Sequence, residues 1–66
     1  MEDMLAYTVR KARLKTLKTQ EEMAEKLGIS RKTYWKLEKD PGEMTVKQAI
    51  VFCRETGLDF DVFSFA

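Results

Sequence analysis

Apolar residues recur along the N-terminal part of the chain at the spacing of an α-helix. Leu5, Val9 and Ala12 follow one another at intervals of four and three residues. Such positions fall on one face of a helix, because the helix completes a turn about every 3.6 residues. The pattern therefore predicts a first helix over about residues 4–15.

A second, shorter helix is predicted between Thr19 and Gly28. The Thr19 hydroxyl can accept from the backbone N–H of Glu22 while the Glu22 side chain reaches back to Thr19, an arrangement known as a capping box. This signal starts the helix at Gln20, and Gly28 ends it by adopting the left-handed conformation at little cost. The apolar stripe of this helix consists of Met23, Ala24 and Leu27.

A third helix follows at once, so the two short helices form a tight helix-turn-helix. Ile29 returns to the core and Ser30 can cap the new helix. At about 100° per residue, Tyr34 and Leu37 point back toward the preceding helix. The opposite arc carries no acidic residue and consists of Arg31, Lys32, Trp35, Lys36 and Lys39.

This basic, tryptophan-bearing arc favours a nucleic-acid partner. A large apolar ring among cations is costly to leave in water unless it meets a partner, and clustered cations on one helix face are typical of a DNA groove reader. The alternative for Trp35 is that it packs onto the N-terminal residues or onto a twofold mate. The alternative for Arg31, Lys32 and Lys36 is an ordinary solvated surface.

The C-terminal half predicts a fourth helix and an apolar end. Pro41-Gly42 is a turn signal, a second capping box at Thr45 and Gln48 opens the helix, and Gly57 closes it. Its expected core arc is Val46, Ala49, Ile50, Phe52 and Cys53, with Val51 outside.

The Phe-rich end is either core, through Phe60 and Phe63, or an edge strand in which Phe60 and Val62 alternate with Phe63 and Phe65. Val51 and Phe65 are the candidates for a contact with a second subunit.

The charge is distributed unevenly. Residues 1–39 hold ten Lys or Arg against six acids, and residues 40–66 hold two against five, so the two parts carry +4 and −3. Such a charge distribution suits a protein that binds an anionic polymer with its basic part and another protein with its acidic part. Cations without an intervening acid cluster at Arg10, Lys11, Arg13, Lys15 and Lys18. Some of these are expected along phosphates, although a solvated face is the equal alternative for Lys11 and Lys15.

Composition bounds the remaining chemistry. A chain of 66 residues forms one small domain, residues 1–66, near the size at which a single core is only marginally sufficient. With no His and one cysteine, Cys53, neither a nucleophile–base pair nor a transition-metal site is expected, and Cys53 is interpreted as a small buried hydrophobe. We therefore expect no enzyme, no cofactor, no metal and no small-molecule effector. The absence of a long apolar run or signal pattern predicts a cytoplasmic protein without a membrane partner.

The run over residues 19–30, TQEEMAEKLGIS, followed by Tyr34 and Leu37-Glu38, resembles the lambda-repressor-like (Cro/XRE-type) helix-turn-helix family. The resemblance extends over about residues 5–63. It implies an all-α, compact five-helix domain, with a short C-terminal extended segment as an option. The family's third helix enters the DNA major groove, usually as a homodimer on a palindromic operator.

The resemblance also implies roles for single residues. Gln20 would bind a phosphate and brace the base-reading Arg31, while Arg13 and Glu38 would form a structural ion pair. Asp59 would cap a short fifth helix ending at about Phe63. The resemblance places Arg31, Lys32 and Lys36 at base-reading positions, and the exposed basic arc adds Trp35 as a fourth expected base reader. Besides Gln20, we also expect phosphate contacts at Thr19, Lys18, Arg10 and Lys39.

Three positions depart from the family's pattern. Tyr34 replaces Ile or Val, so the core must admit its ring or let its hydroxyl escape. Lys18 replaces a common Leu, whose role Leu17 could take one residue earlier. The loop over residues 40–43 is acidic, whereas many members place phosphate-binding cations there.

The sequence as a whole predicts a sequence-specific, double-stranded-DNA-binding regulator of transcription. The simplest version is a dimeric repressor of phage, plasmid or bacterial origin. The alternative is a protein-interaction module on the same scaffold, an antirepressor or a toxin-neutralising antitoxin that uses Trp35 or the Phe-rich end as its hot spot.

Overall fold

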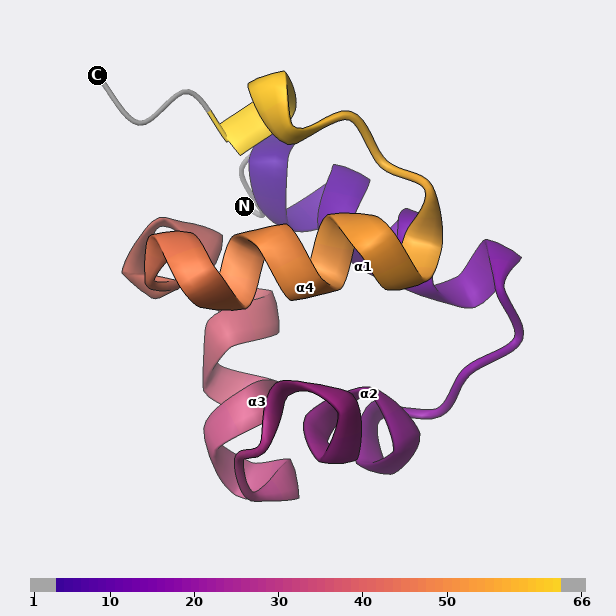
Figure 1. The fold of residues 1–66 in the computed structure, drawn as a ribbon, viewed down its shortest axis with the longest axis vertical. Coiled ribbons are helices and arrows are strands. Elements are labelled where there is room, and N and C mark those ends of the chain that lie inside the picture. Colours follow the sequence, from indigo (N-terminus) through magenta and orange to yellow (C-terminus); the bar gives the residue numbers. More distant parts are fainter. Residues whose placement is uncertain (1–3, 64–66) are drawn as a thin grey trace.

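Four α-helices and two short 3₁₀ helices make up the part of the chain that the computed structural model describes, residues 4–63 (Figure 1). In order they are α1 (Met4–Lys15), α2 (Gln20–Leu27), α3 (Arg31–Lys39), η1 (Pro41–Glu43), α4 (Val46–Thr56) and η2 (Phe60–Phe63). The all-α prediction is confirmed, and the bounds of the first helix agree with the expected residues 4–15. No helix within this range is long and apolar enough to cross a membrane.

The predicted start and stop signals define the helices. Thr19 and Thr45 each form a complete capping box at the start of α2 and α4. The Ser30 hydroxyl accepts from the Thr33 backbone N–H at the start of α3. Gly28 and Gly57 end α2 and α4 in the left-handed region, with φ of 72° and 78°, where an L side chain would be strained.

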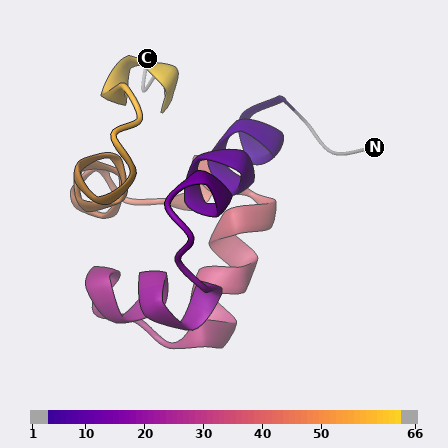
Figure 2. The same cartoon turned by 90° about the vertical axis from the view of Figure 1, so that its right-hand side faces the viewer.

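The helices pack so that α3 keeps one side open. Helix α2 contacts both α3 and α4, and α1 also contacts α3 and α4. Figures 1 and 2 show α2 and α3 together at one end of the molecule, with α4, α1 and η2 toward the other. The helix-turn-helix is thus supported from behind by α1 and α4.

The core gathers side chains from every element. Val9 of α1, Met23 of α2, Tyr34 of α3 and Phe52 of α4 are fully buried. The Phe52 and Phe63 rings meet edge to face, with centroids 6.3 Å apart. Leu5, Ala12, Leu27, Ile29 and Leu58 pack against this cluster while remaining partly exposed.

The expected apolar arc of α4 is partly wrong. Val46 and Ile50 are 52% and 43% exposed, whereas Ala49, Phe52 and Cys53 are buried as predicted. The helix is rotated so that its buried face centres on Ala49 and Phe52, which leaves Val46 and Ile50 at the solvent edge. Val51 is half-buried on the other side of the exposed face.

Leu17 does not take the role of a core leucine. It is 89% exposed and has a positive φ of 62°. The backbone turns sharply after α1, with Leu17 N–H donating to the Leu14 carbonyl, and this turn directs the Leu17 side chain into water. The half-buried Lys18 instead offers its backbone carbonyl to Arg13.

The segment after Gly57 is a short 3₁₀ turn instead of a fifth α-helix. Asp59 Oδ1 accepts from the Asp61 backbone N–H at 2.9 Å, so Asp59 organises the turn as expected. Phe63 is buried, but Phe60 is 36% exposed and does not complete the core. The edge-strand alternative is wrong for residues 60–63, and Phe65 lies outside the described residues.

Candidate nucleic-acid interface

One side of α3 is exposed and basic. Tyr34, Leu37 and Glu38 are buried, so the positions opposite them on the helix face water. All of these positions are exposed, and they are Arg31, Lys32, Trp35, Lys36 and Lys39. We call this set the α3 face. It brings together the four expected base-reading residues and one expected phosphate-binding residue, Lys39.

Trp35 is a surface residue of this chain. Its side chain is 44% exposed, and the Lys39 ammonium lies 4.0 Å from the ring centroid. The indole separates two hollows. One is lined by Arg31, Lys32 and Trp35, and the other by Arg10, Gln20, Trp35, Glu38 and Lys39. Trp35 is therefore not a core residue of the part of the chain that the structure describes, and the alternative in which it packs onto a twofold mate stays open.

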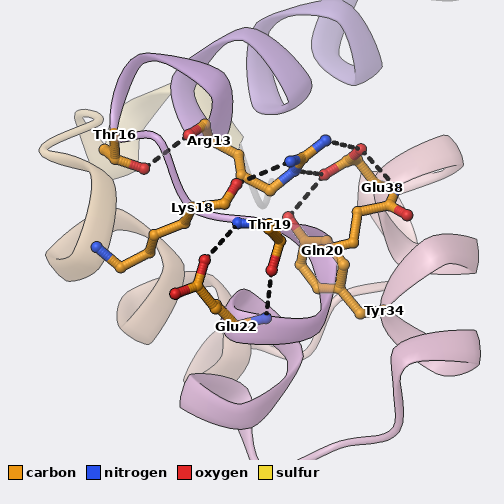
Figure 3. Close-up of polar contacts among 8 residues, drawn as sticks. All are labelled: Arg13, Thr16, Lys18, Thr19, Gln20, Glu22, Tyr34 and Glu38. Atoms are coloured by element: carbon orange, nitrogen blue, oxygen red, sulfur yellow. Dashed lines mark hydrogen bonds and ion pairs between the residues drawn. The ribbon is translucent and has the colours of Figure 1, made fainter.

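The ion pair expected between Arg13 and Glu38 is present (Figure 3). Arg13 Nε donates to Glu38 Oε2 at 2.6 Å, and Arg13 Nη2 donates to Oε1 at 3.2 Å. Both side chains are buried. Arg13 Nη1 also donates to the Lys18 carbonyl at 2.9 Å. One guanidinium thus ties α1 and the loop before α2 to the end of α3.

Two further groups donate to the same carboxylate. Gln20 Nε2 donates to Glu38 Oε1 at 3.1 Å, and the Tyr34 hydroxyl donates to Oε2 at 2.8 Å (Figure 3). Burial raises the pKa of Glu38, but the hydrogen bonds from Arg13, Tyr34 and Gln20 outweigh it and hold that pKa below its usual value. The carboxylate therefore stays charged at neutral pH and orients three helices.

Sequence reasoning missed two bonds of this network, those that Tyr34 and Gln20 donate to Glu38. For Tyr34 the sequence predicts either a core that admits the ring or a hydroxyl that escapes. The ring is fully buried and its hydroxyl binds Glu38 inside the protein. Burial first, and then the bond to Glu38, raise the pKa of the Tyr34 phenol well above its usual range. The spacing of four residues between Tyr34 and Glu38 on one helix was the available signal.

The expected phosphate-binding residues divide into groups. Arg10, Gln20 and Lys39 line the hollow beside Trp35, and Thr19 shares a hollow with Gln20 and Arg31. Gln20 turns its amide nitrogen toward Glu38, so its bracing of Arg31 stays a prediction. The Lys18 ammonium lies 3.9 Å from Glu55 of α4, and its contact with a phosphate stays a prediction.

The expected subunit contacts are only partly described. Val51 lines a hollow between the end of α2 and the start of α4.

Cys53, interpreted as a buried hydrophobe, is buried, and its burial raises the pKa of the thiol.

A family model described as helix-turn-helix matches residues 9–63, which include all of α2, α3 and α4. Comparison with curated proteins and with solved structures returned no match. The matched region contains the two-helix turn, the exposed basic face of α3 and the ion pair that supports it. The chain therefore belongs to the lambda-repressor-like, Cro/C1-type helix-turn-helix family of DNA-binding domains.

Proposed function

We propose that this protein regulates transcription by binding specific sequences of double-stranded DNA as a homodimer on a palindromic operator, most simply as a repressor. The observation that carries the proposal is the α3 face, an exposed helix side of four cations and one tryptophan without an acid. A helix of this kind fits the major groove, where base edges can be read.

The residues of α3 that we propose to contact base edges are Arg31, Lys32 and Lys36. Arg31 and Lys32 lie in its first turn, the part of a reading helix that approaches base edges most closely. Arg31 can bind guanine O6 and N7 with two hydrogen bonds, and Lys36 lies about one turn further along the same face. The buried network around Glu38 supports this role by fixing α3 against α1 and α2.

Phosphate contacts would hold the helix in register. Arg10, Gln20 and Lys39 line one hollow at the edge of the α3 face together with Trp35 and Glu38. A DNA backbone lying there would meet two cations and an amide, beside a carboxylate that Arg13, Tyr34 and Gln20 already bind. Such contacts supply affinity without sequence information and make binding depend on salt. Bound dimers would act by excluding or positioning the polymerase.

The dimer contact is proposed to involve α4, in the acidic half of the chain. Its exposed side bears Val46 and Ile50 at one edge and the half-buried Val51 at the other. Exposed apolar side chains of this kind fit a subunit contact. Phe65 remains a proposed interface residue. Twofold symmetry would place the two reading helices about 34 Å apart, one turn of DNA.

Selection of bound sequences from a random pool of duplexes tests the proposal. The expected result is a consensus made of two inverted half-sites whose centres are about one helical turn apart. Enrichment of no sequence over the starting pool would overturn it. A consensus without inverted symmetry would support sequence-specific DNA binding but contradict binding as a homodimer to a palindromic operator.

The exposed Trp35 also favours a second candidate, a protein-interaction module on the same scaffold. Ionic strength separates the two functions. DNA binding weakens steeply as salt rises, because counterions released from phosphates oppose it, whereas an apolar contact centred on Trp35 would change little.

A further inference from the structure

The chemistry of Trp35 differs from that of every other member of the α3 face. The remaining members, Arg31, Lys32, Lys36 and Lys39, are cations that suit phosphates or base acceptors. Trp35 lies near the middle of the face, one turn after Arg31 and one turn before Lys39. Its apolar ring therefore has to meet some apolar group when the cations around it meet an anionic duplex.

The Trp35 ring has a close cationic neighbour on its own helix. The Lys39 ammonium lies 4.0 Å from its centroid, a cation–π contact between residues one helical turn apart. Trp35 also lines a hollow together with Arg31 and Lys32. The apolar face of the indole thus lies beside two hydrogen-bond donors, Arg31 and Lys32.

Base edges in the major groove offer one apolar group, the methyl at C5 of thymine. Cytosine carries a methyl at the same place when it is methylated at C5. We infer that Trp35 selects, in each half-site, a pyrimidine with a C5 methyl group, next to the bases that Arg31 and Lys32 contact. The inference rests on the proposed function, since it requires α3 to lie in the major groove. The surrounding cations make duplex DNA the occupant of this surface.

The test begins with the selected consensus duplex and replaces each thymine in turn by deoxyuridine, which removes only the methyl group. The wild-type protein should lose affinity at one thymine per half-site, by about fourfold for one replacement and about 15-fold for both, from the burial of one carbon. Trp35→Ala should bind the thymine and uracil duplexes equally. Trp35 is the single tryptophan, so its fluorescence reports the contact directly.

Lys36→Ala is the matched control on the same face. It should bind every duplex more weakly yet keep the same ratio between thymine and uracil. Trp35→Gln, whose amide cannot replace the indole as an apolar wall, should behave as Trp35→Ala does. Circular dichroism checks that these variants fold, which is expected because Trp35 and Lys36 are exposed.

A second arm identifies the pyrimidine. A cytosine at the responsive position is compared with 5-methylcytosine, and a gain of about fourfold on methylation shows that the methyl group itself is read. A response to thymine alone restricts the site to thymine–adenine pairs and still upholds the inference. Equal wild-type binding of thymine and uracil duplexes, or an unchanged uracil penalty in Trp35→Ala, overturns it. Those results leave the proposed function standing, whereas a selection without any consensus overturns both.

Discussion

The Tyr34 hydroxyl donates to Glu38 Oε2 at 2.8 Å within the protein interior, one helical turn apart on α3. The same oxygen accepts from Arg13 Nε at 2.6 Å. Helix α3 therefore carries, on its buried side, a carboxylate bound by its own Tyr34 and by Arg13 of α1. Glu38 also accepts from Gln20 at the start of α2, so this one carboxylate joins α1, α2 and α3.

Removing the tyrosine hydroxyl tests the link with the least disturbance of packing. Tyr34→Phe keeps the buried ring and deletes one hydrogen bond to a charged group, so we expect a loss of about 1.5–3 kcal/mol in the free energy of unfolding. Urea denaturation measures this loss, and the slope of the unfolding free energy against urea concentration should not change. The control is Tyr7→Phe, an exposed tyrosine on α1, which should change stability by less than about 0.5 kcal/mol. Equal effects at the two positions would contradict a buried bond.

Acid should destabilise the protein partly through Glu38. Because the native pKa of this carboxyl is held below its ordinary value, its contribution is fully present above the unfolded pKa and is lost as pH falls through the native one. Urea denaturation between about pH 6 and 3 should show stability falling. The decline should be shallower in Glu38→Gln, which does not titrate there. Parallel pH profiles would mean that other carboxyl groups account for the whole acid effect.

The buried ion pair should show strong coupling. Arg13→Met leaves Glu38 without its cation, and we expect a cost of about 3–5 kcal/mol, with a smaller cost when Glu38→Met is added. The cycle is best measured in Tyr34→Phe, where no phenol loses its acceptor. Variants that unfold too readily can be compared in a stabilising osmolyte. Simple additivity of the two substitutions would show that the pair does not act as a unit.

Arg31 and Lys39 should affect DNA binding in different ways. Arg31→Ala is expected to cost about 1–3 kcal/mol and to relax the preference at one base pair in each half-site. Lys39→Ala should weaken binding to all sequences and lower the slope of log affinity against log salt by about 0.9 per lost phosphate contact. Competition binding with single-base variants of the consensus, at several salt concentrations, distinguishes them. A uniform loss for Arg31→Ala would reassign it to a phosphate.

Ile50 should contribute to self-association. It is 43% exposed on α4, so Ile50→Glu should leave the helix content intact and weaken the dimer by placing a charge in an apolar contact. Sedimentation equilibrium measures the change. Leu14→Glu is the control, because Leu14 is also an exposed apolar residue but lies on α1. If both variants associate as the wild type does, α4 is not the subunit contact.

The local elements and the exposed side of α3 could be read from the sequence alone. Thr19, Gly28, Ser30 and Thr45 act through hydrogen bonds or backbone conformations within a few residues, so their effects do not depend on the rest of the fold. The α3 face follows from the same short-range geometry, since a helix places Tyr34 and Leu37 opposite its cations. The Arg13–Glu38 pair was expected from the family resemblance, and not from spacing.

Tertiary structure decided the positions that depend on how helices are rotated and joined. Ile50 belongs to an apolar arc in any helical projection, but the packing of α4 on α1 and α2 placed its neighbour Ala49 inward. Leu17 became exposed because a left-handed turn ends α1. Arg13, which lies 25 residues before Glu38 in the chain, binds the same carboxylate oxygen as Tyr34. The contact between Arg13 and Glu38 joins residues far apart in the chain, and no local pattern of polar and apolar residues specifies it.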